Sequence, residues 1–179
     1  MTMCYLGHDG LLRLGDLLSG LTAAQVQWSH DNHSLRVILG RSKINRQGDP
    51  ERIYIHDHRG RSAVKMMKMW FDRMSLWNSR ELLFPGFRNA KDGVRKTVSG
   101  SWARSHIKKL VRANGLNPDF YSGHSLRAGG ATDLFVARVP YFLIKKMGRW
   151  KSDAAMIYYR SEQDVVYAVS KAFSKLANT

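Results

Sequence analysis

The chain has 179 residues, of which 44% are hydrophobic, so it can bury one good core and is not a disordered chain. Its net charge of +15 and pI of about 10.3 favour a polyanionic partner, with DNA or RNA as first candidates, although a merely soluble basic surface or a ribosome-associated protein would look the same. Cys4 is the only cysteine, which excludes an intrachain disulfide or cysteine metal cluster, and no apolar run approaches a membrane span or a signal peptide.

The first predicted element is a helix over Asp9–Leu21, whose leucines recur at helical spacing. Arg13 and Asp16 lie three residues apart in it, which is close to one helical turn. Gly15 between them weakens the helix but allows a close backbone approach. Taken alone, the Arg13 and Asp16 pair is either a surface ion pair or the first part of a functional site.

A small antiparallel sheet of three strands is predicted next, since β-branched and aromatic residues alternate with polar ones between turn signals. The three strands are expected around Val26–Trp28, Leu35–Leu39 and Arg52–Ile55. The segment between the second and third strands is basic and contains Arg41, Lys43 and Arg46. His56-Asp57-His58 ends the third strand and is interpreted as a surface cluster, because no further metal ligand is nearby in the sequence.

The middle of the chain combines apolar helices with basic surfaces. Arg61–Arg80 is predicted as a helix with one apolar side, and the stretch from Arg88 to Thr97 as a basic loop that follows a DNA backbone. A further helix runs through Trp102 and Val111, with Ser99 or Ser101 as its cap. The basic residues proposed to contact DNA in these two segments are Arg88, Lys91, Arg95, Lys96, Arg104 and Lys108.

The stretch from Gly123 to Arg160 has the most distinctive motifs. His124 and Arg127 are three residues apart and can face the same way on a helix. Val139-Pro140 begins another helix that Gly148 ends, and Gly148-Arg149-Trp150 follows, with Arg149 as one more candidate DNA contact. Tyr158-Tyr159-Arg160 closes the stretch. Asp164–Leu176 is predicted as a last amphipathic helix.

In this order, the motifs resemble the catalytic domain of the tyrosine recombinases, the phage integrase family. The resemblance implies an α+β fold, mostly helical, with a small three-stranded antiparallel sheet. Arg13 matches the family's first catalytic arginine, and Asp16 would orient it or brace the helix. Lys43 matches the lysine of the β-hairpin, although a solvated loop lysine is the alternative. The other matches to the signature are His124, Arg127 and Trp150.

The position of the nucleophilic tyrosine has two solutions. Counting from Gly148 without a gap gives Tyr158, and Tyr158-Tyr159-Arg160 then fits the Tyr-x-Arg ending that is frequent in the family. Counting from Trp150 gives Tyr159. We favour Tyr158 and keep Tyr159 as the alternative.

The resemblance implies cleavage and rejoining of double-stranded DNA through a 3′-phosphotyrosyl link, for integration or other site-specific recombination. No metal, ATP or other cofactor is expected. Two alternatives remain: nicking and resealing like a type IB topoisomerase, and a catalytically inactive DNA-binding remnant of a mobile element. The expected location is inside the cell on DNA, in the nucleus of a eukaryote or in the cytoplasm or nucleoid of a prokaryote.

The resemblance extends over nearly the whole chain, which corresponds to the catalytic half of a typical recombinase. Residues 1–179 are therefore expected to form a single catalytic domain, with the N-terminal core-binding domain absent. In the family, the C-terminal helix is commonly passed to a neighbouring protomer on DNA. Ser161–Asn178 has the apolar stripe for such an exchange, or else folds back on its own core.

Overall fold

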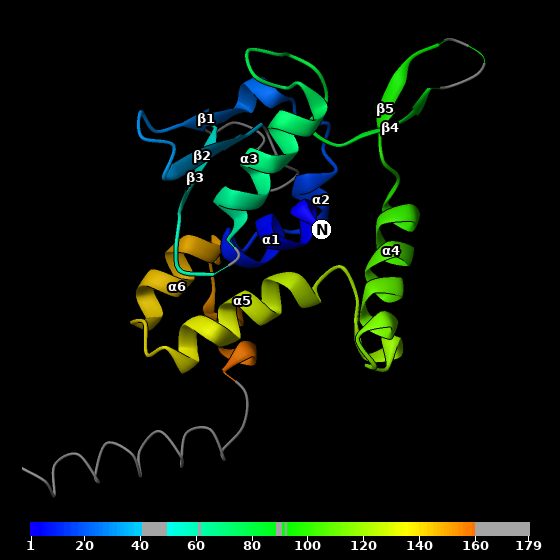
Figure 1. Cartoon of the computed structure of the whole chain (residues 1–179). Coiled ribbons are helices and arrows are strands. Elements are labelled where there is room, and N and C mark those ends of the chain that lie inside the picture. The colour runs from blue at the N-terminus through cyan, green and yellow to red at the C-terminus, as the bar shows by residue number, and fades with distance from the viewer. Residues whose placement is uncertain (41–49, 61, 89–90, 92, 160–179) are drawn as a thin grey trace, which may run out of the picture. The chain divides into compact units, whose positions relative to one another are not determined.

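The computed structural model describes residues 1–40, 50–60, 62–88, 91 and 93–159 (Figure 1). The chain separates into two compact units, of which the first is Met1–Gly130 and the second begins at Ala131. That both units act as one catalytic domain stays a prediction. Within the described residues, no helix is both long and apolar enough to cross a membrane.

A three-stranded antiparallel sheet forms the centre of the first unit, as predicted. Its strands are β1 (Val26–Trp28), β2 (Ser34–Leu39) and β3 (Glu51–His56), in the order β1-β2-β3. Burial alternates along β2 and β3, because side chains of a strand point to opposite faces. The predicted basic segment with Arg41, Lys43 and Arg46 lies outside the described residues.

One face of this sheet packs against α3 (Ala63–Met74), which Figure 1 shows lying across it. Val37 and Ile53 of the sheet share one buried cluster with Met67 and Phe71 of α3. A helix is therefore present within the predicted range Arg61–Arg80, but it is shorter than predicted. It ends at Ser75, whose φ of 53° is left-handed and stops the helical hydrogen bonds.

The predicted helix over Asp9–Leu21 is wrong. The chain instead forms α1 (Thr2–Asp9) and the short α2 (Leu14–Leu17), which are separated by a bend at Leu11 with a φ of 47°. A Cβ on Gly10 would lie 2.8 Å from Ile55 Cδ1, so the residue that follows α1 lies directly against β3. The leucine spacing reflected burial and not one continuous helix, because the leucines at the bend and in α2 are buried as well.

Asp9 joins the end of α1 to the beginning of α3. Its carboxylate accepts hydrogen bonds from the backbone N–H of Ala63 at 2.6 Å and from His8 Nδ1 at 2.9 Å, and His58 Nε2 lies at 3.3 Å. Burial acts to raise the pKa of Asp9, but these hydrogen bonds outweigh it and hold the pKa below its ordinary value of 3.8. Asp9 is thus ionised at neutral pH and satisfies an N–H group of the first turn of α3.

Asp9→Ala is expected to destabilise the protein by about 1–2 kcal/mol, because the N–H of Ala63 loses its partner. Asp9→Asn is the matched control and retains an acceptor oxygen, so it should cost less. Because the folded-state pKa is lowered, the stabilisation is complete above pH 3.8 and is lost as the pH falls through the folded pKa. Urea unfolding of the three proteins measures this, and equal stability of wild type and Asp9→Ala would contradict it.

A two-stranded hairpin replaces the basic loop predicted between Arg88 and Thr97. Its strands are β4 (Pro85–Arg88) and β5 (Arg95–Thr97), with Pro85 opposite Thr97 and Arg88 opposite Arg95. The helix predicted through Trp102 is confirmed as α4 (Gly100–Ala113), capped by Ser99, whose hydroxyl accepts from the N–H of Trp102 at 3.1 Å. Short 3₁₀ turns lie at Ala23–Gln25 (η1) and Pro118–Phe120 (η2).

The second unit is helical. It continues α5 (Ser125–Val136), which begins in the first unit, and contains α6 (Tyr141–Gly148) and η3 (Asp153–Tyr158). The predicted helix after Pro140 is confirmed as α6, and Ser152 caps the 3₁₀ turn η3. Lys145 of α6 forms an ion pair with Asp153 at 2.8 Å, which links α6 to η3 and lowers the pKa of Asp153. The predicted helix Asp164–Leu176 lies outside the described residues.

Candidate active site

Arg127 is buried in the first turn of α5, with only 1% of its surface exposed. Among the described residues it is the one Lys, Arg, Asp or Glu in the buried class. A guanidinium stays charged in proteins, and burying a charge costs free energy that an apolar side chain would not. Arg127 therefore differs from every other Lys, Arg, Asp or Glu that the structure describes. His124 immediately precedes α5 and is exposed.

Close packing places the turn that holds Arg13 against the start of α5. A Cβ on Gly123 would lie 2.6 Å from Leu14 Cδ2, so only glycine allows this contact between the neighbours of His124 and Arg13. Leu126 packs with Leu14 in one apolar cluster. The segments of Arg13, His124 and Arg127 are therefore in direct contact within the first unit.

Glycines also place α5 against α1. A Cβ on Gly7 would lie 3.0 Å from Leu126, and a Cβ on Gly130 would overlap the carbonyl oxygen of His8. Sequence reasoning missed this function of the glycines. The Gly-Gly pair in the helix of Arg127 was the available signal, because glycine inside a helix is unfavourable unless something packs closely there.

Asp16 contacts the backbone of Arg13, and its predicted role of orienting Arg13 or bracing the helix stays a prediction. Arg13 is half-buried at the N-cap of α2, with an extended backbone, and its N–H donates to Asp16 Oδ2 at 2.9 Å. This capping contact fixes the turn that directs the Arg13 side chain.

In the second unit, Trp150 folds back over Gly148. Arg149 between them has a left-handed φ of 59°, and the N–H of Trp150 donates to the carbonyl oxygen of Lys145 at 3.0 Å. The indole then lies so close to Gly148 that a Cβ there would overlap its ring. The Gly148-Arg149-Trp150 motif is therefore a helix end that fixes the position of the indole.

Tyr158 and Tyr159 have different surroundings. The ring of Tyr158 lies 5.6 Å from that of Trp150, and the carbonyl oxygen of Tyr158 accepts from Thr132 Oγ1 at 3.2 Å. Tyr159 lies beyond the end of η3, packs edge-on against Phe135 at 5.0 Å and is 43% exposed. Of the two phenols, Tyr158 is the one beside the predicted site residue Trp150.

The predicted DNA contacts that the structure describes lie mainly on the surface. On the hairpin and its connection these are Arg88, Lys91, Arg95 and Lys96, and on α4 they are Arg104 and Lys108, all of them exposed. Lys108 Nζ lies 3.4 Å from the exposed carboxylate of Asp119. Arg149 in the second unit is half-buried.

The family model named "Phage integrase family" matches residues 2–165, which is most of the chain. The chain belongs to the phage integrase family. No curated protein sequence matches the chain significantly. The membership confirms the resemblance that the ordered motifs indicate, and the α+β fold with its small antiparallel sheet agrees with it.

Several solved structures of integrase-family proteins share this fold. XerA recombinase has a TM-score of 0.70 and 19% identity, covering 96% of this chain and 55% of that one. XerH site-specific recombinase bound to its palindromic difH substrate has a TM-score of 0.68 and 16% identity, covering 94% and 44%. The Tn1549 transposon integrase in complex with circular intermediate DNA has a TM-score of 0.60 and 14% identity, covering 93% and 55%. This chain therefore spans about half the length of these integrase-family structures.

Within the described residues of this integrase-family chain, no three His, Cys, Asp or Glu side chains come together as a metal site would require. In the predicted surface cluster His56-Asp57-His58, His58 contacts Asp9, and Asp57 forms an ion pair with Lys65 at 3.4 Å. The pKa of Asp57 is lowered by hydrogen bonds, of which the one from Ser62 has the largest effect. These residues support the beginning of α3.

Proposed function

We propose that this chain cuts and rejoins double-stranded DNA in site-specific recombination, through a 3′-phosphotyrosyl intermediate. The observation that carries the proposal is the buried Arg127, one turn after His124 and in a segment packed against the Arg13 turn. Membership of the phage integrase family supports the same chemistry. Trp150 and Tyr158, whose rings lie 5.6 Å apart in the second unit, are the proposed hydrogen-bond donor and nucleophile.

The two arginines are proposed to hold the scissile phosphate. A phosphodiester resists attack because it is anionic, and its transition state concentrates more charge on the non-bridging oxygens. Arg13 and Arg127 would neutralise that charge with planar, bidentate hydrogen-bond donors. The burial of Arg127 supports this role, because a buried side chain has fewer accessible rotamers and loses less freedom when it binds a phosphate.

The covalent step replaces one phosphoester bond with another. The Tyr158 hydroxyl loses its proton as its oxygen bonds to phosphorus, the bond from phosphorus to the 5′ oxygen breaks, and that oxygen takes up a proton and leaves as a hydroxyl. Lys43 is the proposed donor of this proton, and His124 assists proton transfer near the nucleophile. Trp150 donates its indole N–H to a phosphate oxygen or packs beside it. The proposal requires no metal or ATP, since the phosphotyrosine retains the bond energy for rejoining.

Double-stranded DNA is the proposed partner, which places the action of the protein on DNA inside the cell. Structures of the XerH recombinase and the Tn1549 integrase contain DNA, and the net charge of +15 of this chain is suited to the same polyanion. The exposed cations of the hairpin and α4, with Arg41 and Arg46, would contact the backbone without selecting sequence.

Trapping the covalent intermediate tests this function. A library of nicked duplexes with a randomised centre samples the target sequence, and the nick releases a short fragment so that cleavage cannot reverse. A protein–DNA adduct that survives denaturation is expected. Relaxation of a supercoiled plasmid without recombination products would favour the topoisomerase alternative, and binding without any adduct would favour the inactive remnant.

Self-association on DNA through the C-terminal helix is a second part of the proposal. Removing all residues after Arg160 is expected to leave a folded protein that binds DNA singly and no longer assembles there. Phe173 alone would contribute about 1.5–3 kcal/mol when buried in a neighbour, which is sufficient for a contact formed on DNA. Sedimentation with and without DNA measures the assembly. A truncated protein that unfolds in solution would show that the helix packs on its own core.

A further inference from the structure

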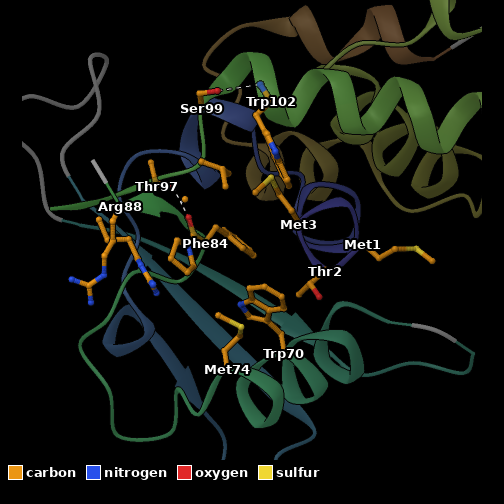
Figure 2. Close-up of a pocket in the computed structure, with 14 residues that line it drawn as sticks. Met1, Thr2, Met3, Trp70, Met74, Phe84, Arg88, Thr97, Ser99 and Trp102 are labelled. Atoms are coloured by element: carbon orange, nitrogen blue, oxygen red, sulfur yellow. Dashed lines mark hydrogen bonds between the residues drawn. The ribbon is translucent and has the colours of Figure 1, made fainter. Parts of the chain in front are cut away.

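An open groove of about 700 Å³ lies in the first unit between the start of α1, α3, the β4–β5 hairpin and the start of α4. Figure 2 shows Trp102 extending from α4 and Trp70 from α3 toward this space, with Met3 and Phe84 beside it. Trp70 is held in place by its indole N–H, which donates to the carbonyl oxygen of Leu83 at 2.8 Å. The proposed cleavage chemistry uses none of these side chains.

The rim of the groove is suited to an anion. Arg88 and Arg95 are opposite each other in the register of the hairpin, and both are exposed and line the groove. No aspartate or glutamate is among the described residues that line it. Ser99, the cap of the 14-residue α4, lies on the same rim. A ligand with an apolar, flat body and a negative charge at its edge would match this distribution.

Trp102 supplies a flat aromatic surface within the groove. It is 43% exposed although it is a large apolar side chain, and it stacks on His106 at 3.7 Å with an angle of 23° between the rings. His106 Nδ1 in turn lies 2.9 Å from the backbone carbonyl oxygen of Trp102. The stack holds the indole in one orientation, as a platform for a planar ligand requires.

We propose that this groove accepts an unpaired nucleobase of the bound DNA, stacked on Trp102, with the adjacent phosphates against Arg88 and Arg95. This rests on the proposed function for its DNA partner. A paired base is enclosed in the duplex, so only an unstacked base can reach the groove. The exposed cations of α4, which include Arg104, Lys108 and Arg112, add further positive charge to the helix that bears Trp102. A DNA strand carries a phosphate at every nucleotide, so it can contact these cations as well as Arg88 and Arg95. A short acidic peptide in the groove would not require the cations outside it.

Two labelled duplexes of one sequence test the proposal with the full chain. One is fully paired, and the other has a single extrahelical 5-iodouracil that can be cross-linked by light. Stacking of one base predicts a roughly 5- to 150-fold preference for the second duplex. Trp102→Leu keeps apolar bulk without the aromatic face, so it should abolish the preference and retain the affinity for paired DNA. Phe120→Ala, which alters an aromatic residue 83% exposed outside the groove, should change neither.

The cross-link decides the location even if Trp102→Leu does not fold. It is expected at Trp102 or Trp70 in the wild type. Equal affinity for the two duplexes, or cross-linking elsewhere, would overturn the proposal while DNA binding itself stands. Failure to bind either duplex would overturn the DNA partner and this inference with it. Quenching of the groove tryptophans by an amphipathic peptide of leucine and glutamate, but not by the extrahelical base, would identify a protein-docking site instead.

Discussion

Tyr158→Phe is expected to abolish the covalent protein–DNA adduct, and Tyr159→Phe is expected to retain it. A phenylalanine has no oxygen to bond to phosphorus, so loss of the nucleophile leaves no residual adduct. Tyr158 is half-buried with its ring 5.6 Å from that of Trp150. Tyr159 instead packs edge-on against Phe135, so its phenol has different surroundings. The ungapped count from Gly148 favours the same assignment.

Each variant is incubated with the nicked duplex library, and the adduct is measured after denaturation. Both substitutions remove one hydroxyl, and Tyr159→Phe is therefore a matched control for the change in volume and polarity. Thermal unfolding of both variants confirms that the second unit is intact. An adduct that persists in Tyr158→Phe and disappears in Tyr159→Phe would reverse the assignment and restore the count from Trp150.

The sequence predicted those elements whose pattern has a local physical cause. Alternating burial along β2 and β3 follows from the two faces of a strand, and both strands were predicted within a residue or two. The cap of α4 at Ser99 follows from backbone chemistry that the sequence displays directly. The end of α6 was predicted at Gly148, but the left-handed residue that ends the helix is Arg149.

The predictions that failed depended on contacts distant in the sequence. The helix over Asp9–Leu21 satisfied the leucine spacing, but α1 ends at Asp9, Gly10 lies against Ile55 of β3, and the chain bends at Leu11. The basic segment after Arg88 lacks the alternation of apolar and polar residues that predicts a strand. The sequence therefore did not indicate that Arg88 and Arg95 pair in a hairpin. The helix over Arg61–Arg80 had the correct apolar face, and the left-handed Ser75 that ends it is not a residue type that marks a helix end.

The candidate site was predicted by motif order, and the structure adds what positions it. The ordered motifs selected His124 and Arg127, but the burial of Arg127 and the contact of Leu14 with Gly123 depend on α5 packing against α2. The sequence also left open whether Asp16 orients Arg13 or braces the predicted helix. The structure adds the hydrogen bond from the Arg13 N–H to Asp16, and the choice between these two roles stays a prediction.

Arg127→Ala is expected to lower cleavage by at least 10²–10³-fold while most of the DNA affinity remains. Removing one donor that stabilises transition-state charge has effects of about this size. Affinity depends on many phosphate contacts, so loss of one should lower the slope of log affinity against log salt by only about one. Arg13→Ala should behave in the same way, because both guanidiniums are proposed to hold the same phosphate.

Two controls separate this role from simple charge or folding effects. Arg104→Ala removes an exposed arginine of α4, and it should change the salt slope by a similar amount without a comparable loss of cleavage. Arg127→Met keeps much of the buried volume, so if it folds and still fails to cleave, the loss is due to the missing charge rather than to a cavity. Rates of adduct formation and anisotropy titrations at several salt concentrations provide both quantities. If binding falls in proportion to cleavage in Arg127→Met and Arg13→Ala, the two arginines belong to the general basic surface, and the phosphate-holding role assigned to them is wrong.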